Sequence, residues 1–369
     1  AAIDVNTGQA TPWNPNASNP YEPAVMDLEV SVSTVYVAGR FSSIGGQPRN
    51  GIAALGIGTG LATPWNPNPD SRVDAIAVSG TTVYAGGMFL SIGGQMRSGL
   101  AALDAITAQA TSWNPNPNPN YWVSALVVSG GSVYAAGSFY TIGGQARQRL
   151  AEIDAVTGLA TAWNPGVDDS VLALVVLGDR VFAGGRFTTI GGASRRHLAA
   201  LDVVTGTATS WNPNASGDVT ALAVSGNTVY AAGVASLGWA ARNNIAALNL
   251  ITGQPTSWNP DVNSTVRAMA MVQDTLYLGG DFTSVGGQTR NRVAALDLTT
   301  GQPLPWNPNA DETVRALAPA GGRIYVAGDF WNIGGGSQRY LAALDTETGQ
   351  ATAWNPTVNN WVFALVLSG

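Results

Sequence analysis

The chain has 369 residues and a net charge of −6, with 45 Gly, 20 Pro, 12 Trp, one His, no Cys and only Arg as its basic residue type. The absence of Cys and Lys excludes disulfides, thiolate nucleophiles, Cys-ligated metal centres and lysine Schiff bases, and the single His197 excludes a His cluster around a metal. The acidic balance argues against a nucleic-acid partner, and no apolar run approaches the ~18–20 residues of a membrane span.

A repeat covers the whole chain. The tripeptide Trp-Asn-Pro occurs eight times at intervals of 47 to 52 residues. Its tryptophans are Trp13, Trp65, Trp113, Trp163, Trp211, Trp258, Trp306 and Trp354. A period of 40–50 residues with several short strands per unit is typical of propeller blades.

Each repeat begins with two predicted strands. The first strand is apolar at nearly every position, as in residues 171–176, which indicates that both faces of the sheet are covered. It ends at a tight turn such as Ser129-Gly130. The second strand carries Val133 and Tyr134 and then the small residues 135–137, which predict a close approach to a neighbouring backbone.

Two further strands complete the repeat. The third strand ends in Asp-x-x-Thr-Gly, as in residues 154–158, where the Asp side chain is expected to accept hydrogen bonds from turn amides. The fourth strand runs to Trp-Asn-Pro, where Pro ends it because Pro has no N–H to donate.

The strand count predicts the fold class and its closure. We expect an all-β fold, a single β-propeller domain over residues 1–369 built from four-stranded antiparallel blades. First, third and fourth strands are marked eight times but second strands only seven times. We therefore favour eight blades, with residues 1–16 and 362–369 in one closing blade that lacks a strand; seven blades is the alternative. The chain is then expected to be part of a longer one.

One stretch of the repeat carries a family resemblance. The run Val-Tyr-Ala-Gly-Gly-x-Phe-x-x-Ile-Gly-Gly-Gln-x-Arg (residues 83–97), followed by Leu-Ala-Ala-Leu-Asp and Trp-Asn-Pro-Asn, resembles the delta-60 repeat propellers of large secreted bacterial proteins. The fifth unit departs from it, with Ala235, Gly238 and Trp239 where Phe and Gly-Gly are expected. The resemblance implies a propeller in an extracellular or bacterial cell-surface protein and implies no chemistry.

A second resemblance concerns the turn after the third strand. Ala-Leu-Asp-x-x-Thr-Gly followed by Trp is similar to the tryptophan-docking motif of the eight-bladed quinoprotein dehydrogenases. Here Trp163 lies five residues after Gly158, whereas that motif places it four after, and the cysteine pair of those enzymes is absent. We predict no quinone and no other cofactor.

Two residue types recur once per blade, and we interpret both as structural. Each Trp of Trp-Asn-Pro is expected to fill the space between blades, because a buried Trp removes about 150–250 Å² from water. The Arg after each Gly-Gly turn is expected to bond turn carbonyls or a neighbouring Asp. These are Arg49, Arg97, Arg147, Arg195, Arg242, Arg290 and Arg339.

The acidic loops and the single histidine are the remaining candidates for a metal site. Asp168 with Asp169, and Asp311 with Glu312, lie in loops after Trp-Asn-Pro, but no segment matches a calcium-binding loop. We predict no metal site. His197 is interpreted as a solvated loop residue.

Variable residues gather in the loops after strands two and four, which emerge on the same side of a blade. We call this side the long-loop face. The aromatic candidates for ligand binding are Trp122, Trp361, Trp239, Trp331, Tyr121 and Tyr140, joined by Tyr21 and Tyr340. At the end of strand two the residue between Gly and Phe varies: Arg40, Met88, Ser138, Arg186, Asp281 and Asp329. Loops on a rigid scaffold commonly carry binding residues, although these aromatics are equally suited to covering the loop bases.

The sequence favours a non-enzymatic module of a secreted or cell-surface protein that binds a glycan or a protein ligand through the long-loop face. One alternative is a structural spacer or assembly unit of an adhesin or surface layer. A second alternative is a polysaccharide hydrolase or lyase in which Asp281 and Asp329 act as acid and base.

Overall fold

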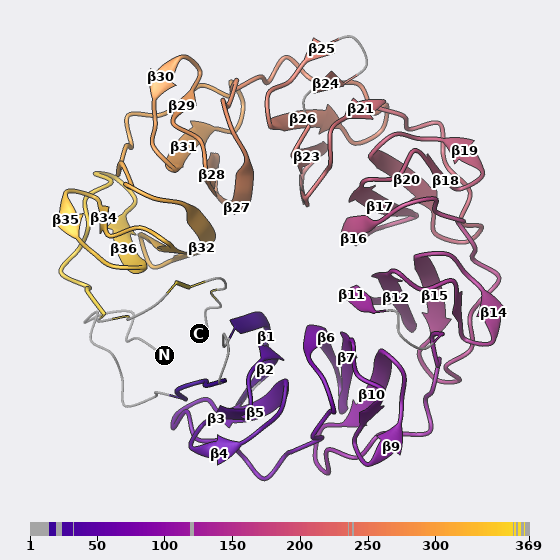
Figure 1. Cartoon of the computed structure of the whole chain (residues 1–369). Helices are drawn as coiled ribbons and strands as arrows, with labels where there is room; N and C mark the ends of the chain where they lie inside the picture. The colour runs from indigo at the N-terminus through magenta and orange to yellow at the C-terminus, as the bar shows by residue number, and fades with distance from the viewer. Residues whose placement is uncertain are drawn as a thin grey trace. The chain divides into compact units, whose positions relative to one another are not determined.

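The computed structural model describes residues 15–19, 24–31, 33–118, 122–234, 236–237, 240–356, 358, 361–362 and 365 (Figure 1). Within these residues every regular element is a β-strand, which confirms the all-β prediction. The chain divides into two compact units; among the described residues, unit 1 ends at Ser210 and unit 2 begins at Trp211.

Unit 1 contains four three-stranded antiparallel sheets, which we call blades 1 to 4. Blade 1 is β1 (Ala24–Ser31), β2 (Thr34–Arg40) and β5 (Ile52–Gly56); blade 2 is β6 (Val73–Ser79), β7 (Thr82–Gly87) and β10 (Leu100–Asp104). Blade 3 is β11 (Val123–Ser129), β12 (Ser132–Gly137) and β15 (Leu150–Asp154); blade 4 is β16 (Val171–Leu177), β17 (Arg180–Gly185) and β20 (Leu198–Asp202).

Unit 2 contains three sheets of the same kind among its described residues, blades 5 to 7. Blade 5 is β22 (Ala221–Ser225), β23 (Thr228–Ala232) and β26 (Ile245–Asn249); blade 6 is β27 (Val266–Val272), β28 (Thr275–Gly280) and β31 (Val293–Asp297). Blade 7 is β32 (Val314–Ala320), β33 (Arg323–Gly328) and β36 (Leu341–Asp345). In every blade the middle strand pairs with both others.

A small hairpin follows the second strand of each blade, on the long-loop face. In every blade except blade 5 the hairpin has a two-residue Gly-Gly turn, such as Gly45 (φ 63°) and Gly46 (φ 76°), with both φ angles positive, as a type I′ turn requires. The hairpins are β3 (Ser43–Ile44) with β4 (Gln47–Pro48), β8 (Ser91–Ile92) with β9 (Gln95–Met96), β13 (Thr141–Ile142) with β14 (Gln145–Ala146), β18 (Thr189–Ile190) with β19 (Ala193–Ser194), β24 (Ser236–Leu237) with β25 (Ala240–Ala241), β29 (Ser284–Val285) with β30 (Gln288–Thr289), and β34 (Asn332–Ile333) with β35 (Gly336–Ser337). A further short strand, β21 (Ala215–Ser216), pairs with β24.

The fourth strand of each blade is shorter than the sequence pattern suggests. It is reduced to one isolated β-bridge, as between Leu103 and Ala110. The next carbonyl, that of Thr111, accepts a hydrogen bond from the guanidinium of Arg97 (2.7 Å). The Arg97 side chain therefore satisfies a carbonyl that a longer strand would bond to a backbone N–H. Pro115 follows shortly after and cannot extend the strand, because it has no N–H to donate.

A β-bulge opens the first strand of six blades. In blade 4, Val171 pairs with Gly185 and Ala173 with Gly184, so Leu172 is bulged. A Cβ at Gly185 would lie 2.1 Å from the carbonyl oxygen of Ser170. The predicted close backbone approach at the end of strand two is therefore confirmed.

The repeated tryptophans join successive blades. Trp163 is fully buried, packs edge-to-face on Tyr134 of its own blade (5.4 Å between ring centroids), and donates from Nε1 to the carbonyl of Asp202 in the next blade (2.9 Å). The same bond to the following turn is made by Trp65, Trp113, Trp211, Trp258 and Trp306. Trp354 is buried against Tyr325, and Trp13 lies outside the described residues.

The repeated arginines bond the strand that ends at each Trp. Arg49, for example, donates to the carbonyls of Pro48 (2.8 Å) and Thr63 (2.6 Å). Corresponding bonds are made by Arg97, Arg147, Arg195, Arg242 and Arg290. The assignment of Arg339 to this set is wrong: Gln338 occupies the position and bonds the carbonyl of Thr352 (3.4 Å), because the chain there is one residue out of the assumed register.

The turn after strand three is held by a carboxylate. Asp202 accepts hydrogen bonds from the N–H of Val204 (3.0 Å) and from the N–H and hydroxyl of Thr205 (2.7 and 2.9 Å). The bonds from Thr205 hold the pKa of Asp202 below its ordinary value. In blade 5 the neutral Asn249 accepts the same three bonds, so the turn itself does not require a charge.

These turns predict acid sensitivity. The pKa values of Asp104, Asp154, Asp202, Asp297 and Asp345 are all lowered by bonds from the turn. A lowered folded-state pKa gives stability that is complete above the unfolded value of about 3.9 and is lost as the pH falls through the folded value. We expect the urea midpoint to fall as the pH is taken from about 5 towards about 2.

Asn249 suggests the matched control. In Asp202→Asn the turn keeps its acceptor but no longer titrates, so the fall of the midpoint with acid should be shallower than in the parent chain. An equally steep fall would show that other groups cause it.

Candidate binding face

The bulge and the end of strand two place two side chains next to each other on the long-loop face. In blade 6, Arg267 is the bulged residue and Asp281 follows the last paired residue of β28. Arg267 donates to both carboxylate oxygens of Asp281, from Nε at 2.9 Å and Nη2 at 2.6 Å. The pair therefore has the two-point geometry that Arg and carboxylates favour.

Blade 7 repeats this arrangement. Arg315 contacts Asp329 through Nε and Nη2, both at 2.7 Å. The hydroxyl of Thr313, at the start of blade 7, donates to Asp281 of blade 6 (2.9 Å). This hydrogen bond connects the ion pair of blade 6 to the beginning of blade 7. The bond from Arg267 outweighs burial and, with Thr313, keeps the pKa of Asp281 below its ordinary value.

Two exposed tryptophans accompany these charges in unit 2. Trp331, at the start of the blade 7 hairpin, is 51% exposed, and the guanidinium of Arg339 lies 4.6 Å from its ring centroid. Trp361 is 53% exposed, with the guanidinium of Arg315 at 5.9 Å. Both contacts are within the range of a cation–π interaction. A hollow of about 470 Å³ between residues 307–309 and the blade 7 hairpin adjoins Trp331 through Asn332.

Unit 1 carries a smaller set on its long-loop face. Trp122, which precedes blade 3, is 40% exposed, and Tyr140 of the blade 3 hairpin is 42% exposed. The guanidinium of Arg149 lies 5.3 Å from the Tyr140 ring. In blade 2, Asp74 is the bulged residue and pairs with Arg72 (3.0 Å).

The loops after Trp-Asn-Pro hold the hairpins of the following blade in place. Asp168 accepts hydrogen bonds from the N–H groups of Thr188 and Thr189 (2.8 and 3.0 Å). Asp311 does the same for Trp331 and Asn332 (2.8 and 3.0 Å). The two acidic pairs considered for calcium thus include carboxylates that position loops. Among the described residues there is no group of three or more acidic or His side chains suited to a metal.

The remaining sequence candidates are distributed as follows. Arg40 and Arg186 are exposed at the ends of β2 and β17, Met88 is exposed, and Ser138 is half-buried. Tyr121, Trp239 and Tyr21 lie outside the described residues. His197 is half-buried, not simply solvated: its backbone is left-handed (φ 60°) and its Nδ1 lies 3.2 Å from the carbonyl of Gly185.

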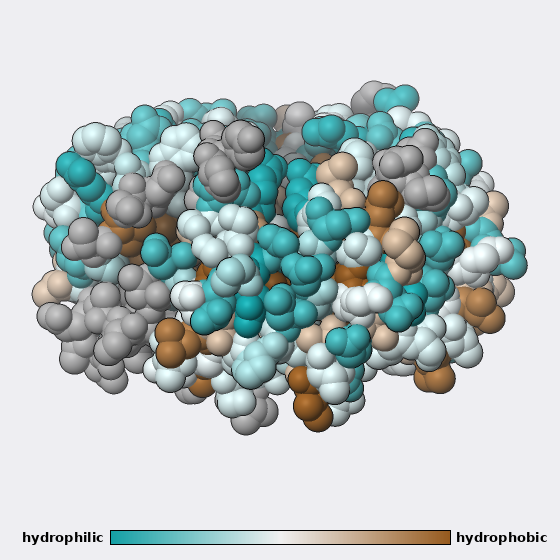
Figure 2. Space-filling view, turned by 60° about the horizontal axis from the view of Figure 1, so that its bottom comes forward, coloured by the Kyte–Doolittle hydropathy of each residue, from teal (hydrophilic) through white to brown (hydrophobic). Residues whose placement is uncertain are grey.

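Sequence reasoning missed the arginine partners. Arg267, Arg315 and Arg339 were not singled out as site residues, yet each contacts a predicted one. The spacing of 14 residues between each bulged Arg and its Asp is a readable signal once the bulge is known. Figure 2 shows the hydrophobic residues of the viewed side as small separate groups among hydrophilic ones.

A family model described as outer membrane protein assembly factor BamB matches residues 97–356. No curated protein matches the chain. Within the described residues there is no helix with the length and apolarity that a membrane crossing needs.

Solved structures with this fold include several propellers. BamB from Moraxella catarrhalis is 19% identical with a TM-score of 0.55, covering 90% of this chain and 86% of that one. The computationally designed Ika8 protein is 16% identical with a TM-score of 0.55, covering 90% and 99%. The WD40 β-propeller domain of Doa1 is 12% identical with a TM-score of 0.53, covering 85% and 92%. At these identities the likeness concerns the fold, and it confirms the β-propeller prediction.

Proposed function

Because the chain belongs to the family of the outer membrane protein assembly factor BamB, we propose that it is a non-catalytic β-propeller module that binds a protein partner through its long-loop face. The observation that carries this proposal is that unit 2 presents the exposed Trp331 stacked on Arg339, the exposed Trp361 beside Arg315, and two Arg–Asp pairs. Trp and Arg are the residue types that most often dominate the energy of protein interfaces.

The chemistry of the acidic residues supports binding over catalysis. A general acid needs a carboxyl group that holds its proton near neutral pH, which requires a raised pKa. The pKa of Asp281 is lowered and its carboxylate is bonded by Arg267 and Thr313. The hydrolase or lyase alternative, with Asp281 and Asp329 as acid and base, is therefore the weakest of the three.

The family and the repeat pattern support a proposal for where the protein acts. A relative named for outer membrane assembly supports a place in the cell envelope, and the resemblance to delta-60 propellers of secreted proteins supports the outer surface. We propose the envelope or cell surface as the site of action. The alternative ligand is a glycan, because exposed Trp rings beside Asp and Arg also suit sugars.

Site-specific crosslinking separates these proposals. A photo-reactive amino acid is placed at Trp331 and Trp122 on the long-loop face, and at Ile251 and Val204 in turns after strand three, which are also exposed (64% and 77%). In envelope preparations from its own cells, we expect one discrete protein adduct from positions 331 or 122. Adducts only from 251 or 204, or equal adducts from all four, would contradict the proposal.

A glycan array is the second experiment and tests for a sugar ligand. Saturable binding that disappears in either Trp122→Ala or Trp331→Ala would make the ligand a glycan and not a protein. If neither crosslinks nor glycan binding occur, the spacer or assembly role is favoured.

A further inference from the structure

Blade 3 contains a carboxylate at a position where every other described blade has Ala. Glu152 lies in the middle of β15, paired across the sheet with Tyr134. The corresponding residues in the other blades are Ala54, Ala102, Ala200, Ala247, Ala295 and Ala343. Glu152 is half-buried beside Tyr134, whose ring packs on the buried Trp163.

Three hydroxyl groups surround the Glu152 carboxylate. Ser132 and Tyr134 donate to Oε1 at 2.6 and 3.1 Å, and Thr161 donates to Oε2 at 2.6 Å. Burial, and then the charge of Glu152, raises the pKa of Tyr134, so Tyr134 remains a protonated donor at neutral pH. The three hydroxyl groups together form a binding site for a carboxylate, and in blade 3 the side chain of Glu152 occupies that site.

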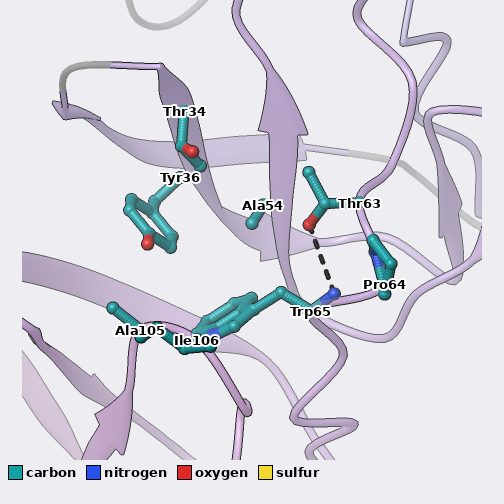
Figure 3. Close-up of a pocket in the computed structure, with 8 residues that line it drawn as sticks. All are labelled: Thr34, Tyr36, Ala54, Thr63, Pro64, Trp65, Ala105 and Ile106. Carbon is teal, nitrogen blue, oxygen red and sulfur yellow. Dashed lines mark hydrogen bonds between the residues drawn. The ribbon is translucent and has the colours of Figure 1, made fainter.

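Blade 1 has the corresponding hydroxyl groups but no carboxylate between them. Tyr36 pairs across the sheet with Ala54, and Thr34 and Thr63 stand where Ser132 and Thr161 stand in blade 3. A hollow of about 260 Å³ is found there; we call it the blade 1 hollow. It is lined by Thr34, Tyr36, Ala54, Thr63, Pro64, Trp65, Ala105 and Ile106 (Figure 3).

The donors of the blade 1 hollow are available. Neither the Tyr36 nor the Thr34 hydroxyl makes a hydrogen bond with another described residue. Thr63 uses its oxygen to accept from the N–H of Trp65 (3.2 Å), as Thr161 does from Trp163 while still donating to Glu152. In Figure 3, Ala54 lies between Tyr36 and Thr63, where a longer side chain would enter.

We propose that the blade 1 hollow binds a carboxylate at the end of a short aliphatic chain. The ligand's carboxylate takes the place of the Glu152 group, accepting from Tyr36, Thr34 and Thr63, and its methylene groups pack on Trp65. Exposed Pro64 and Ile106 form the entrance. The source is either a free short-chain acid or the acidic side chain of a partner protein.

The charge beside the hollow does not prevent this. Asp104 lies in the turn bonded by Trp65, and its charge contributes, after burial, to the raised pKa of Tyr36. Asp202 occupies the same turn beside blade 3, bonded by Trp163, and Glu152 is nevertheless held there.

Propionate tests the proposal, because it reproduces the Glu side chain from Cβ to the carboxylate. Sodium propionate is titrated at pH 7 while the indole N–H signal of Trp65 is followed by NMR, with 1-propanol as the uncharged control. We expect a saturable shift with propionate only. Ala54→Glu, which supplies an attached carboxylate, should abolish it, and Tyr36→Phe, which keeps the ring, should weaken binding about tenfold.

An equal shift in Ala54→Glu, or with 1-propanol, would overturn the proposal; so would unchanged affinity in Tyr36→Phe, which serves even where Ala54→Glu does not fold. A second titration uses N-acetyl-glutamic acid α-amide. Binding at least tenfold tighter than that of propionate assigns the carboxylate to a protein side chain, and equal or weaker binding assigns it to a free acid.

Discussion

Replacing Trp163 by Ala lowers the free energy of unfolding by about 3–5 kcal/mol. The ring is fully buried, packs on Tyr134, and contacts the Asp202 turn of the next blade through its Nε1 bond and its edge. Truncation leaves a cavity at the junction between two blades and an unpaired turn carbonyl. Urea unfolding followed by circular dichroism measures the change.

Trp122→Ala is the matched control for this prediction. Its ring is 40% exposed and belongs to the long-loop face, so we expect a change within about 0.5 kcal/mol. Equal losses in the two variants would show that the repeated tryptophans do not hold the blades together.

Gly185→Ala is expected to lower the free energy of unfolding by about 1–3 kcal/mol, with a larger loss if the bulge cannot move. The new Cβ would stand 2.1 Å from the carbonyl oxygen of Ser170. That oxygen is fixed because it accepts the N–H of Arg186 (2.8 Å), so relief of the clash breaks a backbone hydrogen bond.

Gly58→Ala controls for the substitution itself. A Cβ there meets nothing within 4 Å, and its backbone is not left-handed. The change should be neutral or slightly stabilising, since Ala restricts the unfolded chain. Similar losses at positions 58 and 185 would contradict the steric account.

The repeat made most of the scaffold predictable. Each of its signals has a local physical cause: Gly-Gly for a type I′ turn, Asp-x-x-Thr-Gly for a capped turn, and small residues where two backbones meet. These causes act within one blade, so a single sequence contains them. The reduced fourth strand was not predictable, because the Arg97 bond that replaces its ladder is a tertiary contact.

The sequence pattern predicts which face carries the candidate site, but it does not predict which arginines contact the acidic and aromatic residues there. The bulge at Arg267 brings residues 14 apart into contact, and nothing in the local pattern marks a bulge. Gln338 occupies the position of the repeated Arg, so Arg339 contacts the Trp331 ring instead. An alignment of the repeats that places Arg339 with the other arginines does not reveal this contact. The predicted closing blade of residues 1–16 and 362–369 lies almost wholly outside the described residues, and the number of blades stays a prediction.

Binding through the long-loop face is tested most directly by the affinity of the crosslinked partner. The dissociation constant is measured for the parent chain, Trp331→Ala, Arg339→Ala and Ile251→Ala. We predict that Trp331→Ala weakens binding about thirtyfold, as for an interface hot spot worth about 2 kcal/mol, and that Arg339→Ala weakens it less. Ile251→Ala should leave it unchanged. Unchanged affinity in Trp331→Ala, with a loss in Ile251→Ala, would contradict the account.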